Sequence, residues 1–112
     1  MKKPVTTGKK VFTQKDFIER MGALYAENLE IARRKNADYS NTNDPFQNFR
    51  VSEALGIPAE KAIIVRMSDK LMRIANLIGR ERQVADETIG DTLSDLANYS
   101  MILRMYLEQK NK

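Results

Sequence analysis

The sequence predicts a single all-α domain, an antiparallel bundle of three long helices and one short helix. Apolar residues recur every three or four positions along three long stretches, which is the spacing of one helix face. Capping residues mark where these stretches begin and end. The last two stretches are joined by a link of the length that connects antiparallel neighbours. At 112 residues the domain can bury only a thin core, so we expect it to form homo-oligomers.

The composition excludes several kinds of chemistry. The chain has no cysteine and no histidine, which removes disulfides, zinc–thiolate sites, and Cys or His as nucleophile or base. Any bound metal must take oxygen ligands, a requirement that Mg²⁺, Mn²⁺ and Ca²⁺ meet. No apolar run is long enough to span a membrane, and no signal-peptide core follows the N-terminal lysines. We therefore expect a cytoplasmic protein without a membrane partner.

Positive charge gathers at the two ends of the chain. The net charge is +4, and much of the excess comes from lysines near the termini. Residues 1–12 are basic and lack periodicity, so we expect a disordered tail followed by one helical domain over residues 13–112. This charge is compatible with an anionic ligand. Nucleic acid is not an expected partner, because no known recognition motif accompanies the basic tails.

The first long helix is predicted from Thr13 to about Lys35. Thr13 is placed to cap the helix, with Asp16 reaching back to it in a variant of the capping box. Asn28 interrupts the apolar stripe and, once buried, needs a polar partner on another helix or a ligand. The stripe consists of Phe17, Ile18, Met21, Leu24, Tyr25, Leu29 and Ala32.

Residues 36–57 are predicted to form a long connection, rich in turn-forming Asn, Asp, Ser and Thr. Its three aromatic residues are Tyr39, Phe46 and Phe49. They either plug the end of the bundle or stack on a flat ligand such as a nucleobase, and the sequence leaves both open. Within the connection, residues 51–55 are expected to make one or two helical turns that end at Gly56.

The next long helix is predicted over residues 58–78, with Pro58 at its first position and Gly79 closing it. Its apolar stripe is broad enough that we expect this helix to pack on two sides. The stripe consists of Ile63, Ile64, Met67, Leu71, Ile74, Ala75 and Ile78. The narrow polar sector is charged, and an ion-pair ladder along the helix would account for it structurally.

The last helix is predicted over residues 86–109, and one of its faces is acidic at one end and apolar at the other. At 100° per residue, Glu87, Asp91 and Asn98 fall nearly on one line, with Asp95 beside it. Carboxylates four residues apart repel each other, so a metal ion or basic side chains should lie close to them. Acids in the first turn also complement the helix dipole, which is a structural alternative for part of the cluster.

The last two helices are expected to fold against each other with Asp69 and Asp91 at a similar height. The carboxylates that could then act as catalytic residues and hold Mg²⁺ are Asp69, Glu87 and Asp91, with Asp95 as a further metal ligand. The basic side chains that would bind phosphate are Arg66, Lys70 and Arg73. The same charges could instead neutralise one another in a structural salt-bridge network.

Three motifs carry a resemblance to a known family: KNADYS at residues 35–40, RMSDKLMR at 66–73 and ETIGDTLSDLANY at 87–99. Over residues 20–107 the chain resembles the phage and bacterial nucleotide modification associated domain of type one. That family is similar in turn to MazG-like all-α nucleoside-triphosphate pyrophosphatases. The resemblance implies a MazG-like fold, Mg²⁺ held between two acidic helical motifs, a bound nucleotide or nucleoside triphosphate, and a homodimer or homotetramer.

The resemblance also assigns residues to roles. It aligns Asp69 with the last acid of the first metal-binding motif, and Glu87 and Asp91 with the second motif. Arg66 stands where the first motif has a glutamate, so the metal-binding set is reduced. Lys35 is also expected to bind phosphate, and the residues expected near the base are Tyr39, Phe46 and Asn98.

Three functions follow as hypotheses. The first is an Mg²⁺-dependent pyrophosphohydrolase of nucleoside or deoxynucleoside triphosphates, with Mn²⁺ as an alternative ion, in which metal-bound water attacks between the α and β phosphates. The second is a non-catalytic module that binds or sequesters nucleotides, which the missing acid at Arg66 favours. The third is a helical phage protein that binds a host factor through the face carrying Met101 and Met105.

Overall fold

The computed structural model describes residues 11–39, 43–80 and 86–112, except for the side chains of residues 38, 39 and 86–88. Its elements in chain order are α1 (Gln14–Tyr39), α2 (Gln47–Arg50), the 3₁₀ helix η1 (Val51–Leu55), α3 (Ala59–Ile78) and α4 (Asp86–Lys110). These described segments contain no strand, which confirms the predicted all-α class. None of their helices is long and apolar enough to cross a membrane. Most of the predicted basic tail, residues 1–10, lies outside the described residues.

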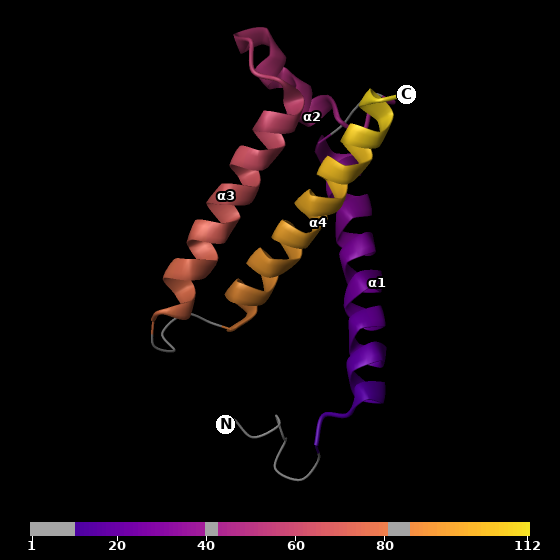
Figure 1. Ribbon diagram of the computed structural model, residues 1–112, viewed down its shortest axis with the longest axis vertical. Coiled ribbons are helices and arrows are strands. Elements are labelled where there is room, and N and C mark those ends of the chain that lie inside the picture. Colours follow the sequence, from indigo (N-terminus) through magenta and orange to yellow (C-terminus); the bar gives the residue numbers. More distant parts are fainter. Residues whose placement is uncertain (1–10, 40–42, 81–85) are drawn as a thin grey trace.

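The helices form an open bundle (Figure 1). α3 and α4 run antiparallel, side by side, and make the most extensive contact between any two elements. α1 crosses α4 and contacts it through its C-terminal half. The short α2 and η1 lie at the end of the bundle where α3 begins and α4 ends.

α1 begins where the sequence predicts and continues beyond the predicted end at Lys35. The Thr13 N–H donates to Asp16 Oδ2 over 3.0 Å, and the Asp16 N–H donates to Thr13 Oγ1 over 3.1 Å, which confirms the capping box. At the other end, Asn36 Nδ2 donates to the Pro45 carbonyl oxygen over 3.0 Å. Tertiary contacts of this kind override the local turn tendency of Asn and Asp, so the helix extends to Tyr39.

The segment between α1 and α3 carries aromatic side chains into the core. Phe46 is buried and meets Tyr106 of α4 edge to face, with ring centroids 5.4 Å apart. Phe49 is buried in the same way against Tyr99, at 6.1 Å. Edge-to-face contact is a favourable geometry for aromatic pairs. These two residues therefore plug the end of the bundle, which was one of the two interpretations of the sequence.

The predicted turns before α3 are present. η1 spans Val51–Leu55 and ends at Gly56, whose φ of 79° lies in the left-handed region that glycine adopts without strain. Pro58 is the residue that caps α3 and not its first helical residue, because its ψ of 147° is extended. A proline at this point still begins the helix without losing an internal hydrogen bond.

The core of the bundle is small and lies at the end near α2. Its buried members are Phe46, Phe49, Ala59, Ile63 and Tyr106. Ile63 and Ala59 are fully buried, and Ile63 is the largest side chain of which this is true in the described part of the chain. An ion pair between Glu60 and Lys110 joins the start of α3 to the end of α4 next to this core. Ile74 of α3 and Thr92 of α4 are buried farther along the helix pair, and much of each long helix remains in solvent.

Two apolar surfaces are left uncovered by the part of the chain that the structure describes. The N-terminal half of α1 extends past the ends of α3 and α4 (Figure 1), and Phe17, Met21 and Leu24 on it are 48%, 41% and 39% exposed. Within the described residues, α3 packs against α4 and, near its N-terminal end, against α2 and η1, while Ile64, Leu71 and Ile78 along it stay exposed. Exposed apolar surface of this extent is uncommon on a soluble monomer.

Candidate functional site

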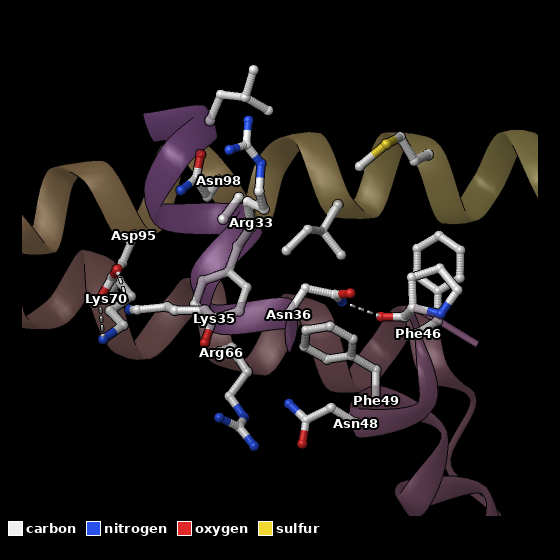
Figure 2. A pocket seen from close by; sticks show the side chains of 16 residues that line it. Arg33, Lys35, Asn36, Phe46, Asn48, Phe49, Arg66, Lys70, Asp95 and Asn98 are labelled. Carbon is white, nitrogen blue, oxygen red and sulfur yellow. Dashed lines mark hydrogen bonds and ion pairs between the residues drawn. The ribbon is translucent and has the colours of Figure 1, made fainter. Parts of the chain in front are cut away.

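A pocket of about 680 Å³ lies between the C-terminal half of α1, the segment around α2, and the middle of α3 and α4 (Figure 2). Apolar and aromatic side chains form much of its wall: Leu29, Phe46, Phe49, Tyr99, Ile102 and Met105. Four basic side chains line it, Arg33, Lys35, Arg66 and Lys70. Three amides, Asn36, Asn48 and Asn98, and one carboxylate, Asp95, complete its polar lining. The pocket thus carries a net positive charge beside an apolar wall.

Asp95 links the three long helices on one side of the pocket (Figure 2). Lys35 Nζ of α1 lies 3.0 Å from Asp95 Oδ1, and Lys70 Nζ of α3 lies 2.9 Å from Asp95 Oδ2. Burial by itself would raise the pKa of the Asp95 carboxyl, but the hydrogen bonds from Lys70 and Lys35 outweigh burial and hold it below its usual 3.8. Asp95 is therefore ionised at neutral pH, with a cation on each oxygen.

The Asp95 bridge predicts a pH dependence of stability. A carboxyl whose pKa is lowered on folding stabilises the folded state above its unfolded pKa, near 3.8, and loses this contribution as the pH falls further. We expect Asp95→Asn to lower the free energy of unfolding by less than about 1 kcal/mol at pH 6, since both lysines are partly exposed. As the pH falls below 3.8 and through the lowered pKa of the folded state, the variant and the original chain should converge. Urea unfolding between pH 6 and pH 3 measures the difference in unfolding free energy between the two proteins. A difference that stays constant over this range would contradict the prediction.

Two of the amides are held by hydrogen bonds to backbone carbonyls. Asn36 Nδ2 donates to the Pro45 carbonyl, and Asn98 Nδ2 donates to the Asn28 carbonyl over 3.1 Å, which ties α4 to α1. The side-chain Oδ1 of Asn28 is buried and has no hydrogen-bond partner in the described part of the chain. The sequence predicts a polar partner for the Asn28 side chain. Asn98 instead binds the backbone oxygen of Asn28, and the side-chain Oδ1 has no partner among the described residues.

The structure brings together six of the residues that the sequence assigns to the metal, phosphate or base site. They line the pocket: Lys35, Phe46, Arg66, Lys70, Asp95 and Asn98. Arg73, Asp69 and Asp91 are exposed and do not line it. The side chains of Glu87 and Tyr39 lie outside the described residues. The basic and aromatic part of the predicted site therefore gathers in one place, and the expected convergence of Asp69 with Asp91 is not part of it.

The described carboxylates do not fit a metal centre in this pocket. Asp95 is the only carboxylate among the described side chains that line it, and both its oxygens bind lysines. Over residues 11–37, 43–80 and 89–112, no three acidic side chains gather closely enough to hold an ion. A hard divalent cation needs several oxygen ligands, so these side chains supply no such set here.

Several pocket residues were absent from the predicted site. Arg33 and Asn36 lie four and seven residues after Leu29, so they share its side of α1. Helical spacing could have indicated Arg33 directly, and Asn36 once α1 is extended past Lys35. Asn48 lies in α2, and no pattern in the sequence places that helix beside Arg66. Figure 2 shows the polar ends of Asn48 and Arg66 on the same side of the pocket.

Comparison with protein-family models, with curated proteins and with solved structures finds no match to this chain. The resemblance carried by the three motifs therefore stays a prediction. The pocket and its lining are the observations on which a functional proposal can be based.

Proposed function

We propose that the protein binds a nucleotide in this pocket, with the phosphates near the basic side chains and the base against the apolar wall. The observation that carries the proposal is the combination of four cationic side chains with aromatic and aliphatic surface in one cavity. Polyphosphates are bound through charge-assisted hydrogen bonds, and a base gains from contact with apolar and aromatic surface. A volume of about 680 Å³ is in the range of small-molecule pockets.

The Asp95 bridge is the part of the pocket that a phosphate group would change. Lys35 and Lys70 each bind one oxygen of Asp95, so their ammonium groups are already held close together before a ligand arrives. Each ammonium group carries three donors, so it can bind a phosphate oxygen while keeping its carboxylate partner. Arg66, which is exposed at the pocket, adds a guanidinium group that matches phosphate geometry. Preformed cations of this kind favour an anion over a neutral ligand of similar size.

The proposal is for binding, and hydrolysis is not part of it. A pyrophosphohydrolase of the predicted type requires carboxylates that hold Mg²⁺ at the triphosphate. Asp69 and Asp91 are exposed and do not line the pocket. A nucleoside triphosphate carries Mg²⁺ with it in solution, so the ion can be bound together with the nucleotide. A catalytic metal site would need ligands outside the described side chains.

A matched pair of arginine variants tests the proposal. We expect thermal stabilisation by at least one member of a panel of nucleoside and deoxynucleoside triphosphates, with or without Mg²⁺. Arg66→Gln should weaken binding of that nucleotide about tenfold, because one charge-assisted hydrogen bond is lost. Arg73→Gln removes the same charge from the same helix outside the pocket and should change the affinity less than about twofold. Calorimetric titration gives both values.

Three results distinguish the hypotheses. Binding without pyrophosphate release supports the proposed module. Release of pyrophosphate that depends on Mg²⁺ and is lost in Asp91→Asn would replace it with the hydrolase. The proposal is contradicted if no member of the panel stabilises the protein, or if Arg66→Gln and Arg73→Gln lose nucleotide affinity equally.

A further inference from the structure

Two amide side chains of the pocket are held so that each leaves its oxygen for a ligand. Asn36 Nδ2 donates to the Pro45 carbonyl oxygen over 3.0 Å, and Asn98 Nδ2 donates to the Asn28 carbonyl oxygen over 3.1 Å. A carbonyl oxygen accepts hydrogen bonds and cannot donate one, so only the NH₂ group of each amide can face it. The end of each amide that is left over is therefore Oδ1, which can only accept.

Both of these side-chain oxygens are available to a ligand. Neither Asn36 Oδ1 nor Asn98 Oδ1 has a hydrogen-bond partner in the described part of the chain. Asn36 is exposed, and Asn98 Oδ1 stays accessible, whereas the Oδ1 of Asn28 is buried. Because both residues line the pocket, a ligand meets two acceptors, one from α1 and one from α4, whose orientation is set before it arrives.

The two acceptors lie between the charged side of the pocket and its apolar wall. On α4, Asn98 follows Asp95 by three residues and precedes Ile102 by four, so these side chains succeed one another along one face of the helix. On α1, Asn36 follows Lys35, and Figure 2 shows it between Lys35 and the two labelled phenylalanines. A nucleotide with its phosphates at the lysines and its base against the apolar wall would bring the edge of that base to these oxygens.

The common bases differ in what they can donate to a pair of acceptors. The exocyclic amino group of adenine, cytosine or guanine carries two N–H bonds that point in different directions, so it can donate to two oxygens. Uracil and thymine carry a single ring N–H between two carbonyl oxygens. They can therefore satisfy at most one acceptor, and they turn an oxygen of their own toward the other, which leaves that acceptor unpaired.

We infer that the pocket selects nucleotides whose base carries an exocyclic amino group over those of uracil and thymine, and that Asn36 and Asn98 make this selection. The inference rests on the proposed nucleotide binding and adds the class of base to it. Turning either amide to offer its NH₂ group would break its bond to the backbone, so the preference is fixed. Asn48, the third amide of the pocket, has no side-chain hydrogen bond in the described part of the chain and can turn either end to a ligand.

Matched pairs of nucleotides test the inference on the original chain. Cytidine and uridine triphosphates differ by the exchange of an amino group for a carbonyl oxygen and by a proton on the neighbouring ring nitrogen, and adenosine and inosine triphosphates differ in the same way. Calorimetric titration should show the amino member of each pair binding about tenfold more tightly. Asn36→Ala and Asn98→Ala should each reduce this ratio to about threefold, because one of the two acceptors is lost. Asn48→Ala should weaken both members of a pair equally and leave the ratio unchanged.

The ratio of dissociation constants separates selection from folding. Both members of a pair are titrated into the same preparation, so unfolded protein reduces the number of binding sites and not the ratio. A ratio near one or a preference for the uridine or inosine nucleotide in the original chain would overturn the inference, as would a ratio that Asn36→Ala and Asn98→Ala both leave unchanged. Each of these results leaves the proposed nucleotide binding in place, whereas no binding of any of the four nucleotides would overturn both.

Discussion

Replacing Ile63 with alanine should lower the free energy of unfolding by about 3 kcal/mol, a large effect for a single truncation. Ile63 is fully buried in the small cluster that joins α2, α3 and α4. Truncating this side chain leaves a cavity next to Ala59, Phe46 and Tyr106. The rings of Phe46 and Tyr106 are held in edge-to-face contact, so they cannot move easily to fill it. For a domain of this size, the loss corresponds to a fall in melting temperature of about 15 °C.

A neighbouring truncation on α3 serves as the control. Val65 is 56% exposed and lies outside the core, so Val65→Ala should change the unfolding free energy by less than about 0.5 kcal/mol. Urea unfolding followed by circular dichroism measures both variants at one protein concentration. Similar losses in the two variants would mean that the cluster around Ile63 is not the stabilising core.

The second large effect is expected at Lys70 and concerns ligand affinity. Lys70→Glu removes one of the two cations on Asp95 and adds a carboxylate to the pocket. Attraction to a triphosphate then becomes repulsion, and we expect the affinity for the nucleotide identified in the panel to fall about a hundredfold. The free energy of unfolding should also fall by about 1 kcal/mol, because Asp95 and the new carboxylate repel across α3 and α4.

Lys61→Glu is the matched control for this substitution. Both substitutions replace a lysine with a glutamate, so the two variants have the same net charge. Lys61 is exposed on the same helix and does not line the pocket. Its nucleotide affinity should stay within about threefold of the original, because the charge is far from the ligand and screened by salt. Calorimetric titration at 0.15 M salt compares the two. Equal losses would show that net charge, and not the geometry around Asp95, governs binding.

The bounds of the helices followed from short-range chemistry. Thr13 and Asp16 form the predicted capping box, Gly56 ends the 3₁₀ helix, and α3 and α4 begin and end within about two residues of their predicted limits. These features depend on side chains a few positions apart, so a single sequence contains the information they need. The end of α1 was predicted too early, because the contact of Asn36 with Pro45 holds the last turn and lies outside any local pattern.

In the candidate site, too, local sequence determines some features and the packing of helices determines others. Periodicity placed Arg66 and Lys70 on one side of α3 and Asp95 on the polar side of α4, and the structure brings these three to one pocket. It does not bring Asp69 there, although Asp69 is only one residue before Lys70, because one position turns the helix face by about 100°. Helical spacing gives the angle between residues on one helix. It does not give the rotation of that helix relative to its neighbours.

The all-α character of the described segments and, apart from the end of α1, their helix limits are therefore properties of local sequence, since hydrogen bonds and caps within each helix span only a few residues. The meeting of Lys35, Lys70 and Asp95 and the aromatic plug of Phe46 and Phe49 depend on packing between distant segments. That packing is set by how the apolar side chains of several helices fill a shared volume, which no single stretch of sequence specifies.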